Sequence, residues 1–286
     1  MTVTDQAIPL RSVQKMHVPV ARLKERQKMA VRRTWRRILT GFIGVLLAIA
    51  GWEIAAAIIN DPITLPNVQD TAQAFWTYLF KEYPAQGNTL WQDILVSTGR
   101  ILLGFSVGTL GGVLLGSVMA AVRVIRELVD PLIELTRPLP PLAFIPLFVV
   151  WFGIGETPKF VLILIGVIPV MTVATVSALD RVPQDYLNAS RALGASHFHT
   201  LLFVRVRAAL PAIITGMRLA MGLSWTSIVA VEMIAATSGV GFLILQAGNN
   251  LQMPLLFAGI LTISLLGILL DGALRLLHRF ADPSTR

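Results

Sequence analysis

The sequence has no cysteine and few charged residues for its length. The lack of cysteine in 286 residues excludes disulfides, thiolate metal ligands and a cysteine nucleophile. Only 14% of the residues are charged and 55% are hydrophobic, whereas a soluble domain has about 25% charged and about 45–50% apolar residues. A soluble protein of this size could not cover its surface with so few charges. The composition therefore predicts that much of the chain lies in lipid.

The sequence also lacks the motifs of common nucleotide-binding and metal sites. It contains neither G-x-x-x-x-G-K-[ST] nor H-E-x-x-H, so we do not expect this chain to bind ATP phosphates or a catalytic zinc ion in those ways. His197 and His199 are two residues apart and would not share a helix face. A membrane-embedded enzyme would need a cluster of acid, base or metal-binding residues, which the sequence does not suggest. We expect no catalytic residue, metal or cofactor in this chain.

Long apolar stretches predict an all-α polytopic membrane protein with six transmembrane helices. A helix crosses the hydrocarbon core with about 20 apolar residues. One window, Leu139–Ile154, is shorter and follows three prolines, so we expect it to extend back toward Leu128 with a kink. The other five windows are Ile38–Ile59, Ile101–Val122, Phe160–Leu179, Ala208–Ala236 and Leu255–Leu270.

The distribution of Lys and Arg supports six spans, because these residues collect on the cytoplasmic side. Their numbers in successive segments outside the spans are 10, 1, 3, 1, 4, 0 and 3. Both termini are therefore expected in the cytoplasm. The division is a basic tail (1–37), a transmembrane domain (38–280) and a C-terminal tail (281–286). The basic tail predicts an orientation signal or contact with lipid headgroups, and its long apolar neighbour argues against a cleavable signal peptide.

Two smaller patterns predict helix packing. Val68–Phe80, in the first outer loop, has apolar residues at helical spacing, so we expect a helix that lies at the membrane interface or packs on the bundle. Gly104, Gly108, Gly112 and Gly116 recur every four residues and would form a flat strip for close helix contact. Packing is the favoured explanation, and the strip could also be a surface along which helices slide between two conformations.

The inner loop 180–211 predicts a short amphipathic helix. Pro183 and Asp185 are typical of a helix start, and Gly194 is typical of a helix end. Small residues leave one surface of this helix without protruding side chains, so a helix or groove of another protein could approach closely. These small residues are Ala189, Ser190, Ala192, Gly194, Ala195 and Ser196.

Three residues of the fifth span form a polar stripe. Arg218, Trp225 and Glu232 are spaced by seven, so they share one helix face. Arg218 is expected near the middle of the bilayer and Glu232 near the outer surface, too far apart to pair with each other. In one interpretation Arg218 adds positive potential to an anion pathway, Trp225 narrows the pathway and Glu232 belongs to an outer gate.

A second interpretation makes the same stripe a seam between helices. Buried charges often pair with each other, and Arg218 would then pair with Glu53 or Asp271. Arg100, near the outer start of the second span, is expected to extend its charge to the membrane surface. Glu53 and Arg100 complete the set of candidate pathway residues.

The inner loop resembles the EAA loop of ABC importer permeases, E-A-A-x3-G-x9-I-x-L-P. Asn188-Ala189-Ser190 occupy the first three places and Gly194 has the matching spacing. Asn188 replaces the acid, Ser190 the second alanine, and Val206-Arg207 stands where Leu-Pro is usual. The resemblance implies a coupling helix at about 184–199 that docks into a separate ATPase subunit. The implied coupling residues are Asp185, Asn188, Ala189, Ser190, Ala192, Leu193, Gly194, Ala195 and Ser196.

Other motifs are similar to those of the nitrate/taurine/alkanesulfonate importer group, and the taurine-type permeases look most similar. They are Arg137–Ala143 (RPLPPLA), Trp151–Glu156 (WFGIGE), Trp225 with Val231–Ile234 (VEMI), and Gly239–Phe242 (GVGF). The resemblance covers roughly residues 38–280.

The resemblance implies a permease subunit of a bacterial inner-membrane importer. Its implied partners are a second copy of the permease, two ATPase subunits that carry ATP and Mg, and a periplasmic binding protein. The implied solute is a small oxyanion such as taurine or another sulfonate, with nitrate or a heteroaromatic nutrient as alternatives. A gradient-driven secondary transporter or channel is the alternative class. It should show inverted halves or polar broken helices, which the sequence does not suggest.

Overall fold

The computed structural model describes residues 20–83, 87–136 and 139–281. The first part of the basic tail, the residues after Ala281 and the Arg137-Pro138 pair lie outside the described residues. For residues 20–35, 37 and 38 only the backbone is described. The regular structure of the described ranges is entirely helical. The chain divides into two units, Met1–Ile58 and Ile59–Arg286.

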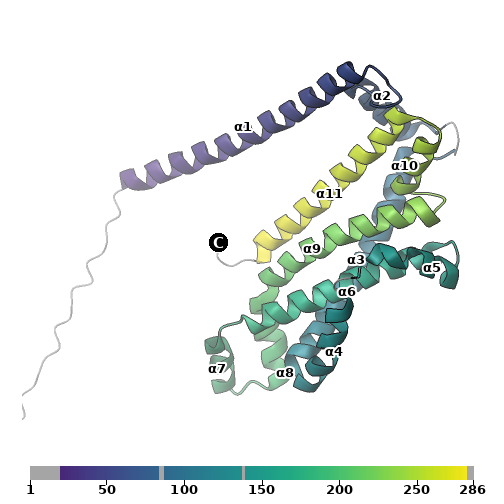
Figure 1. The fold of residues 1–286 in the computed structure, drawn as a ribbon. Helices are drawn as coiled ribbons and strands as arrows, with labels where there is room; N and C mark the ends of the chain where they lie inside the picture. The colour runs from purple at the N-terminus through teal and green to yellow at the C-terminus, as the bar shows by residue number, and fades with distance from the viewer. Residues whose placement is uncertain (1–19, 84–86, 137–138, 282–286) are drawn as a thin grey trace, which may run out of the picture. The chain divides into compact units, whose positions relative to one another are not determined.

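The first unit contains one helix, α1 (Val20–Ile59), of 40 residues (Figure 1). Its stretch Leu39–Ile59 has a mean hydropathy of 2.3 and is long enough to cross a membrane, which confirms the predicted first span. The helix begins at Val20, so part of the segment predicted as a tail is helical.

The second unit contains ten α-helices in its described part. Asn67 caps the first of them by accepting a hydrogen bond from the Asp70 backbone N–H (2.7 Å). The helices are α2 (Val68–Phe80), α3 (Leu90–Ala121), α4 (Arg123–Thr136), α5 (Ile145–Phe152), α6 (Glu156–Asp180), α7 (Gln184–Ala192), α8 (His197–His199), α9 (Val206–Ala235), α10 (Val240–Asn249) and α11 (Met253–Ala281), together with the 3₁₀ turn η1 (Pro141–Phe144) and the π-helical stretch η2 (Thr200–Arg205).

Five helical stretches of the described chain are long and apolar enough to cross a membrane, and the count reaches six if α4 and η1–α5 form one span. The axes of those two pieces differ by 85°. The segment predicted as a kinked third span is therefore two short helices with a sharp bend between them. The predicted extension back toward Leu128 is helical, and the helix that contains it, α4, already begins at Arg123. The second span begins at Leu90 rather than Ile101.

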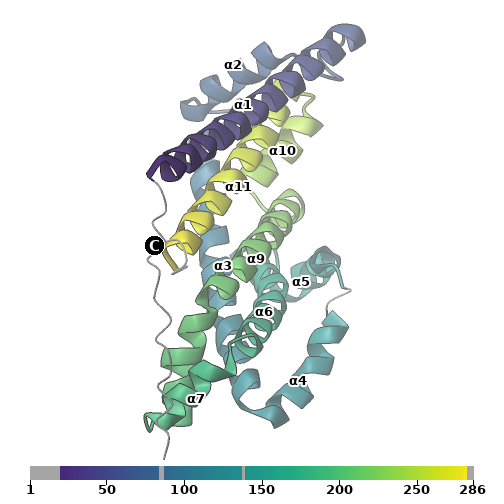
Figure 2. The same ribbon diagram turned by 90° about the vertical axis from the view of Figure 1, so that its left-hand side faces the viewer.

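Helices α3, α6 and α9 enclose the main apolar core (Figure 2). The predicted glycine strip of α3 faces α6. A Cβ atom built on Gly112 would lie 2.5 Å from the Met171 Cβ, and one on Gly108 would lie 2.8 Å from the Val167 Cγ1. Gly111, one residue off the strip, would meet Ile168 only at 3.7 Å. The predicted close packing is confirmed, whereas sliding along the strip stays a prediction.

The predicted helix in the first loop is confirmed with the same bounds, as α2. It packs on α11 and α3 and buries Thr71 and Ala74, so the packed alternative is observed. Trp76 and Phe80 remain 69% and 74% exposed. Their position at a membrane interface stays a prediction.

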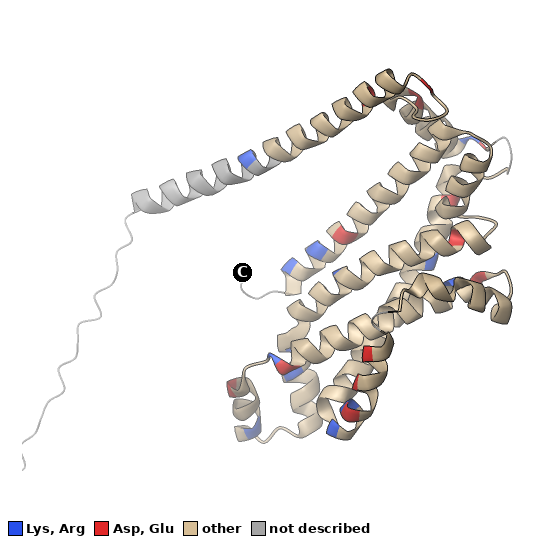
Figure 3. Cartoon of the chain, in the orientation of Figure 1, with Lys and Arg blue, Asp and Glu red and all other residues tan. Residues whose placement is uncertain are grey.

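Helices α7 and α10 lie at opposite ends of α9 (Figure 1). We call these ends of the second unit the α7 end and the α10 end. Charged residues of this unit gather toward the two ends, and the long middle stretches of α6 and α9 between them are largely uncharged (Figure 3). The candidate sites therefore lie in two separate places.

Candidate functional site

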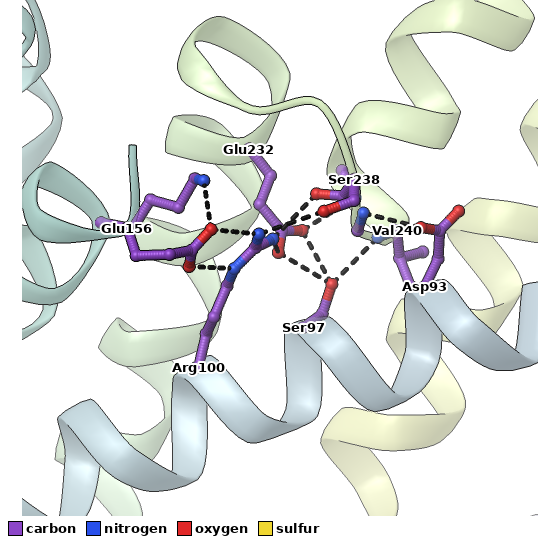
Figure 4. Close-up of polar contacts among 10 residues, drawn as sticks. Asp93, Ser97, Arg100, Glu156, Glu232, Ser238 and Val240 are labelled. Atoms are coloured by element: carbon purple, nitrogen blue, oxygen red, sulfur yellow. Dashed lines mark hydrogen bonds and ion pairs between the residues drawn. The ribbon is translucent and has the colours of Figure 1, made fainter. Parts of the chain in front are cut away.

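A polar network at the α10 end joins α3, α6, α9 and α10 (Figure 4). Helix α3 supplies Asp93, Ser97 and Arg100, which are four and three residues apart and so share one face of the helix. Helix α6 supplies Glu156 and Lys159. All these residues lie within or beside apolar helices, where an unpaired charge is costly.

Arg100 forms the centre of this network. Its Nε and Nη2 donate to the two carboxylate oxygens of Glu156, each at 2.6 Å. Its Nη1 donates to the Glu232 carboxylate (2.7 Å) and to the Ser238 carbonyl (2.8 Å), and Nη2 also reaches the Ser238 hydroxyl at 3.2 Å. A guanidinium has five N–H groups. These five contacts use all of them.

The Glu232 side chain is completely buried. Its carboxylate accepts hydrogen bonds from Arg100, from the Ser97 hydroxyl (2.8 Å) and from the Gly241 backbone N–H (3.1 Å). Taking a carboxylate out of water is strongly unfavourable unless it is paired and hydrogen-bonded. The three donors offset that cost and fix the end of α9 against α3.

The side chains of Asp93, Ser97 and Glu232 accept hydrogen bonds from the backbone N–H groups at the start of α10. The first N–H groups of a helix have no partner within the helix. The Gly239 N–H donates to the Asp93 carboxylate (2.8 Å), and the Val240 N–H donates to the Ser97 hydroxyl (2.9 Å). Gly239 has a φ of +113°, and a Cβ on Gly241 would lie 2.6 Å from the Val229 carbonyl oxygen. The Gly-Val-Gly motif is therefore required by this tight turn around Glu232.

Tyr83 lies beside the network and is 3% exposed. Burial, followed by the negative charge of Asp93, raises the pKa of the Tyr83 phenol above its ordinary value of 10.0. A direct side-chain contact with the Asp93 carboxylate adds to this rise in the pKa of Tyr83. The phenol therefore stays neutral next to the carboxylate.

The structure corrects the expectation for Arg100 and supplies residues that the sequence analysis missed. Arg100 does not extend its charge to the membrane surface, because its side chain is 11% exposed and bonded inside the network. Asp93, Ser97 and Glu156 were not predicted as partners. The spacing of the first two from Arg100 would have marked one polar helix face, had α3 been expected to start before Ile101.

Arg218 forms a second charged group, nearer the α7 end. Its Nε and Nη2 donate to Asp271 of α11 at 2.7 and 3.2 Å. Arg275 also binds Asp271, at 2.6 Å, so two cations share one anion. The predicted pairing of Arg218 with Asp271 is confirmed. The other suggested partner, Glu53, lies on α1 in the first unit, and its role stays a prediction.

Trp225 packs in the core of the second unit. It is 8% exposed, and its indole N–H has no hydrogen-bond partner among the described residues. A cavity of about 970 Å³ lies between η1, α6 and α9, with Pro141, Ile165 and Leu223 in its apolar wall. The stripe residues of α9 are not part of that wall, so their role in a pathway stays a prediction.

The predicted start and end of the coupling helix are confirmed in α7. Pro183 precedes the first turn, and Asp185 lies in it. At the other end Gly194 has a φ of +78°, its N–H donates to the Arg191 carbonyl (2.9 Å), and the Ala195 N–H donates to the Ser190 carbonyl (3.1 Å). This pair of bonds is the Schellman motif. The helix therefore ends at Ala192, short of the expected 184–199 range.

One face of α7 packs on η2 and the other is exposed. Leu187 is buried, and the Ser190 hydroxyl lies 2.8 Å from that of Thr200. Ser196 caps α8 by accepting from the His199 N–H at 3.2 Å. The exposed face carries five of the predicted coupling residues, Asp185, Asn188, Ala189, Ala192 and Leu193. Large apolar side chains are exposed on or near this face at Tyr186 (56%), Leu193 (89%) and Phe198 (71%).

Comparison with known proteins defines the class. The family described as "Binding-protein-dependent transport system inner membrane component" matches residues 108–282, and this chain belongs to that family. Inward-facing structures of the MetNI methionine ABC transporter share the fold. One superposes with a TM-score of 0.55 at 22% identity and covers 68% of this chain and 94% of that one.

The relatives place the chain in the nitrate/taurine/alkanesulfonate group. The taurine transport system permease TauC of Escherichia coli K12 is 37% identical over 85% of this chain and 88% of its own length. The putative aliphatic sulfonates permease SsuC of the same strain is 32% identical over 87% and 92%. The nitrate import permease NrtB of Synechococcus elongatus is 28% identical over 85% and 88%. The chain is thus a multi-pass ABC transporter permease, and these relatives are transport components rather than enzymes.

Proposed function

We propose that this chain is the membrane-spanning subunit of an ATP-driven importer for a small organic anion, with taurine or another aliphatic sulfonate as the solute. A periplasmic binding protein would deliver the solute, and two separate ATPase subunits would bind ATP and Mg. The 37% identity to a taurine permease supports the solute class. Nitrate and a heteroaromatic nutrient are the alternative solutes.

The observation that carries this proposal is the exposed face of α7. Tyr186, Leu193 and Phe198 form an apolar surface at the α7 end, next to the small side chains of Ala189 and Ala192. Such a surface is typical of a protein contact. Asp185 and Asn188 add polar groups to it. An ATPase groove would cover this face, as the similarity to the EAA loop implies.

The orientation follows from the same proposal. The α7 end and both termini face the cytoplasm of a bacterial cell, since the basic segments fall on that side of the inner membrane. Two copies of the permease form a homodimer. ATP binding brings the two ATPase subunits together and moves α7. This movement opens the solute pathway alternately to the two sides of the membrane.

The charged groups take different parts in this cycle. Arg218 and Arg275 share the single carboxylate of Asp271, so this region of α9 and α11 keeps a positive potential that attracts an anion. Trp225 lies seven residues further along the same face of α9 and narrows the solute pathway. Arg100 and Glu232 hold the α10 end together, and Glu53 of α1 is a further pathway candidate.

A reconstituted system tests the proposal. The permease, with the ATPase and the binding protein encoded beside it, is placed in vesicles and supplied with radiolabelled taurine. We expect ATP-dependent uptake that is lost when the P-loop lysine of the ATPase is replaced. Accumulation of taurine by the permease alone would instead identify a gradient-driven transporter. ATP-driven uptake of nitrate but not of sulfonates would overturn the solute class and retain the importer.

A further inference from the structure

Arg205 lies where the π-helical stretch η2 meets α9. Its Nε donates to the Leu179 carbonyl at 3.0 Å, its Nη1 to the Ala120 carbonyl at 3.1 Å, and its Nη2 to the Asp180 carboxylate at 3.0 Å. One side chain thus binds the last turn of α6 and the last turn of α3. The side chain is 20% exposed, so solvent reaches only part of it.

The chemistry of these acceptors suits an arginine. The last carbonyls of a helix carry partial negative charge, and two helix ends, those of α3 and α6, meet at Arg205. Its planar fork can bind three acceptors at once, whereas a lysine presents a single point charge. Asp180 also accepts from Arg126 of α4 at 2.9 Å. The cluster therefore gathers α3, α4 and α6 around the last residue of η2.

On its other side, η2 contacts α7. Ser190 and Thr200 are hydrogen-bonded through their buried hydroxyls, and Leu187 is buried in the same contact. Thr200 and Arg205 are the first and last residues of η2. A continuous path of contacts thus runs from α7 through η2 to the ends of α3 and α6. π-Helical turns frequently occur at functional sites.

We propose that Arg205 is the positioning residue that holds the coupling segment (residues 184–205) on the ends of α3 and α6, so that a movement of α7 moves the bundle. This inference rests on the proposed importer function. It adds to that function a specific mechanical connection, which α7 and its docking surface alone do not provide.

The positioning is tested first on the purified permease, without any partner. The chain has no cysteine, so Arg191→Cys on α7 and Ala121→Cys at the end of α3 introduce the only two labelling sites, both at exposed positions. We expect a narrow spin-label distance distribution in the parent and a broad one in Arg205→Ala. Asp180→Asn neutralises the carboxylate that Arg205 shares with Arg126 but leaves the two carbonyl acceptors of Arg205, so it should broaden the distribution less. Arg207→Ala is the matched control, because Arg207 is exposed and makes none of these contacts. An unchanged distribution in Arg205→Ala overturns the inference.

The consequence is tested in the reconstituted complex. Arg205→Ala should retain ATP hydrolysis but lower the taurine transported per ATP by about two- to thirty-fold, and Arg205→Lys should restore part of it. Equal losses of hydrolysis and uptake, with no rescue by lysine, contradict a positioning role. Absence of ATP-driven taurine uptake in the unmodified complex contradicts the proposed function instead. The distance measurement still decides the role of Arg205 in that case.

Discussion

The two ends of the second unit hold their charges in different ways. At the α10 end, Arg100 and Glu232 have side chains that are 11% and 0% exposed, and every N–H of the guanidinium is bonded. At the α7 end, the side chains of Arg126, Asp180 and Arg205 are 20–40% exposed. The same residue types therefore form a network around a buried ion pair at one end, with Glu156 as its exposed member (65%), and an open cluster at the other.

This difference has an energetic meaning. Removing one partner from a buried ion pair leaves an uncompensated charge, whereas partly exposed pairs are screened by water and contribute little. The α10 end is consequently specified as a single arrangement. The partly exposed ion pairs at the α7 end can exchange partners at a low cost in free energy. This suits the end of the molecule that moves with α7 in the proposed cycle. The following experiments test this contrast, starting from the largest expected change in stability.

Arg100→Ala should be the most damaging change, because it leaves Glu232 buried without its cation. We expect the free energy of unfolding to fall by about 3–5 kcal/mol, measured by thermal or denaturant unfolding of the purified protein. Arg123→Ala removes an ion pair of similar geometry whose arginine is 90% exposed, and it should leave the unfolding midpoint nearly unchanged. Equal effects of the two variants would refute the contrast.

Gly112→Ala tests the packing that connects the two ends. Its new Cβ would meet Met171 and the Ile168 carbonyl, so we expect a loss of about 1–3 kcal/mol from overpacking. Gly111→Ala is the control, because its Cβ lies at an ordinary contact distance. Alanine is also the better helix former, so this variant should be as stable as the parent or slightly more stable. A destabilised Gly111→Ala would argue against the strip as the contact.

Arg218→Ala should change the unfolding midpoint little, because Asp271 keeps its bond to Arg275. Its expected effect is on transport. If Arg218 supplies positive potential to the anion route, taurine uptake in the reconstituted complex should be abolished while the ATPase still binds. Normal uptake in this variant would make the stripe a structural seam.

Tyr83→Phe should have a small effect on stability, about 0.5–1.5 kcal/mol, because it removes a single side-chain interaction, the one with Asp93. The substitution should also change how the free energy of unfolding depends on pH. A phenol with a raised pKa binds its proton more tightly when folded, so its contribution to stability is present below about pH 10 and is lost as the pH rises above that value. The decline in unfolding free energy at high pH should be shallower in Tyr83→Phe. An equally steep decline would show that Tyr83 is not the group responsible.

Local features of this fold could be predicted from the sequence, and distant pairings could not. Val68–Phe80 and the end of α7 at Gly194 follow from spacing and backbone preference, which act within a few residues. Asp271 was one of two partners suggested for Arg218, and spacing alone did not distinguish it from Glu53. The contacts of Arg100 with Glu156 and Glu232 join residues 56 and 132 positions apart. Only the packing of α3 against α6 and α9 brings them together.

The turn before α10 has a consequence for any solute that passes it. Free backbone amides at a helix start attract anions, yet Asp93, Ser97 and Glu232 already occupy those of Gly239, Val240 and Gly241. A sulfonate or nitrate ion arriving there meets carboxylates instead of vacant donors. In the proposed importer, the start of α10 is therefore not available as a binding site for an anionic solute.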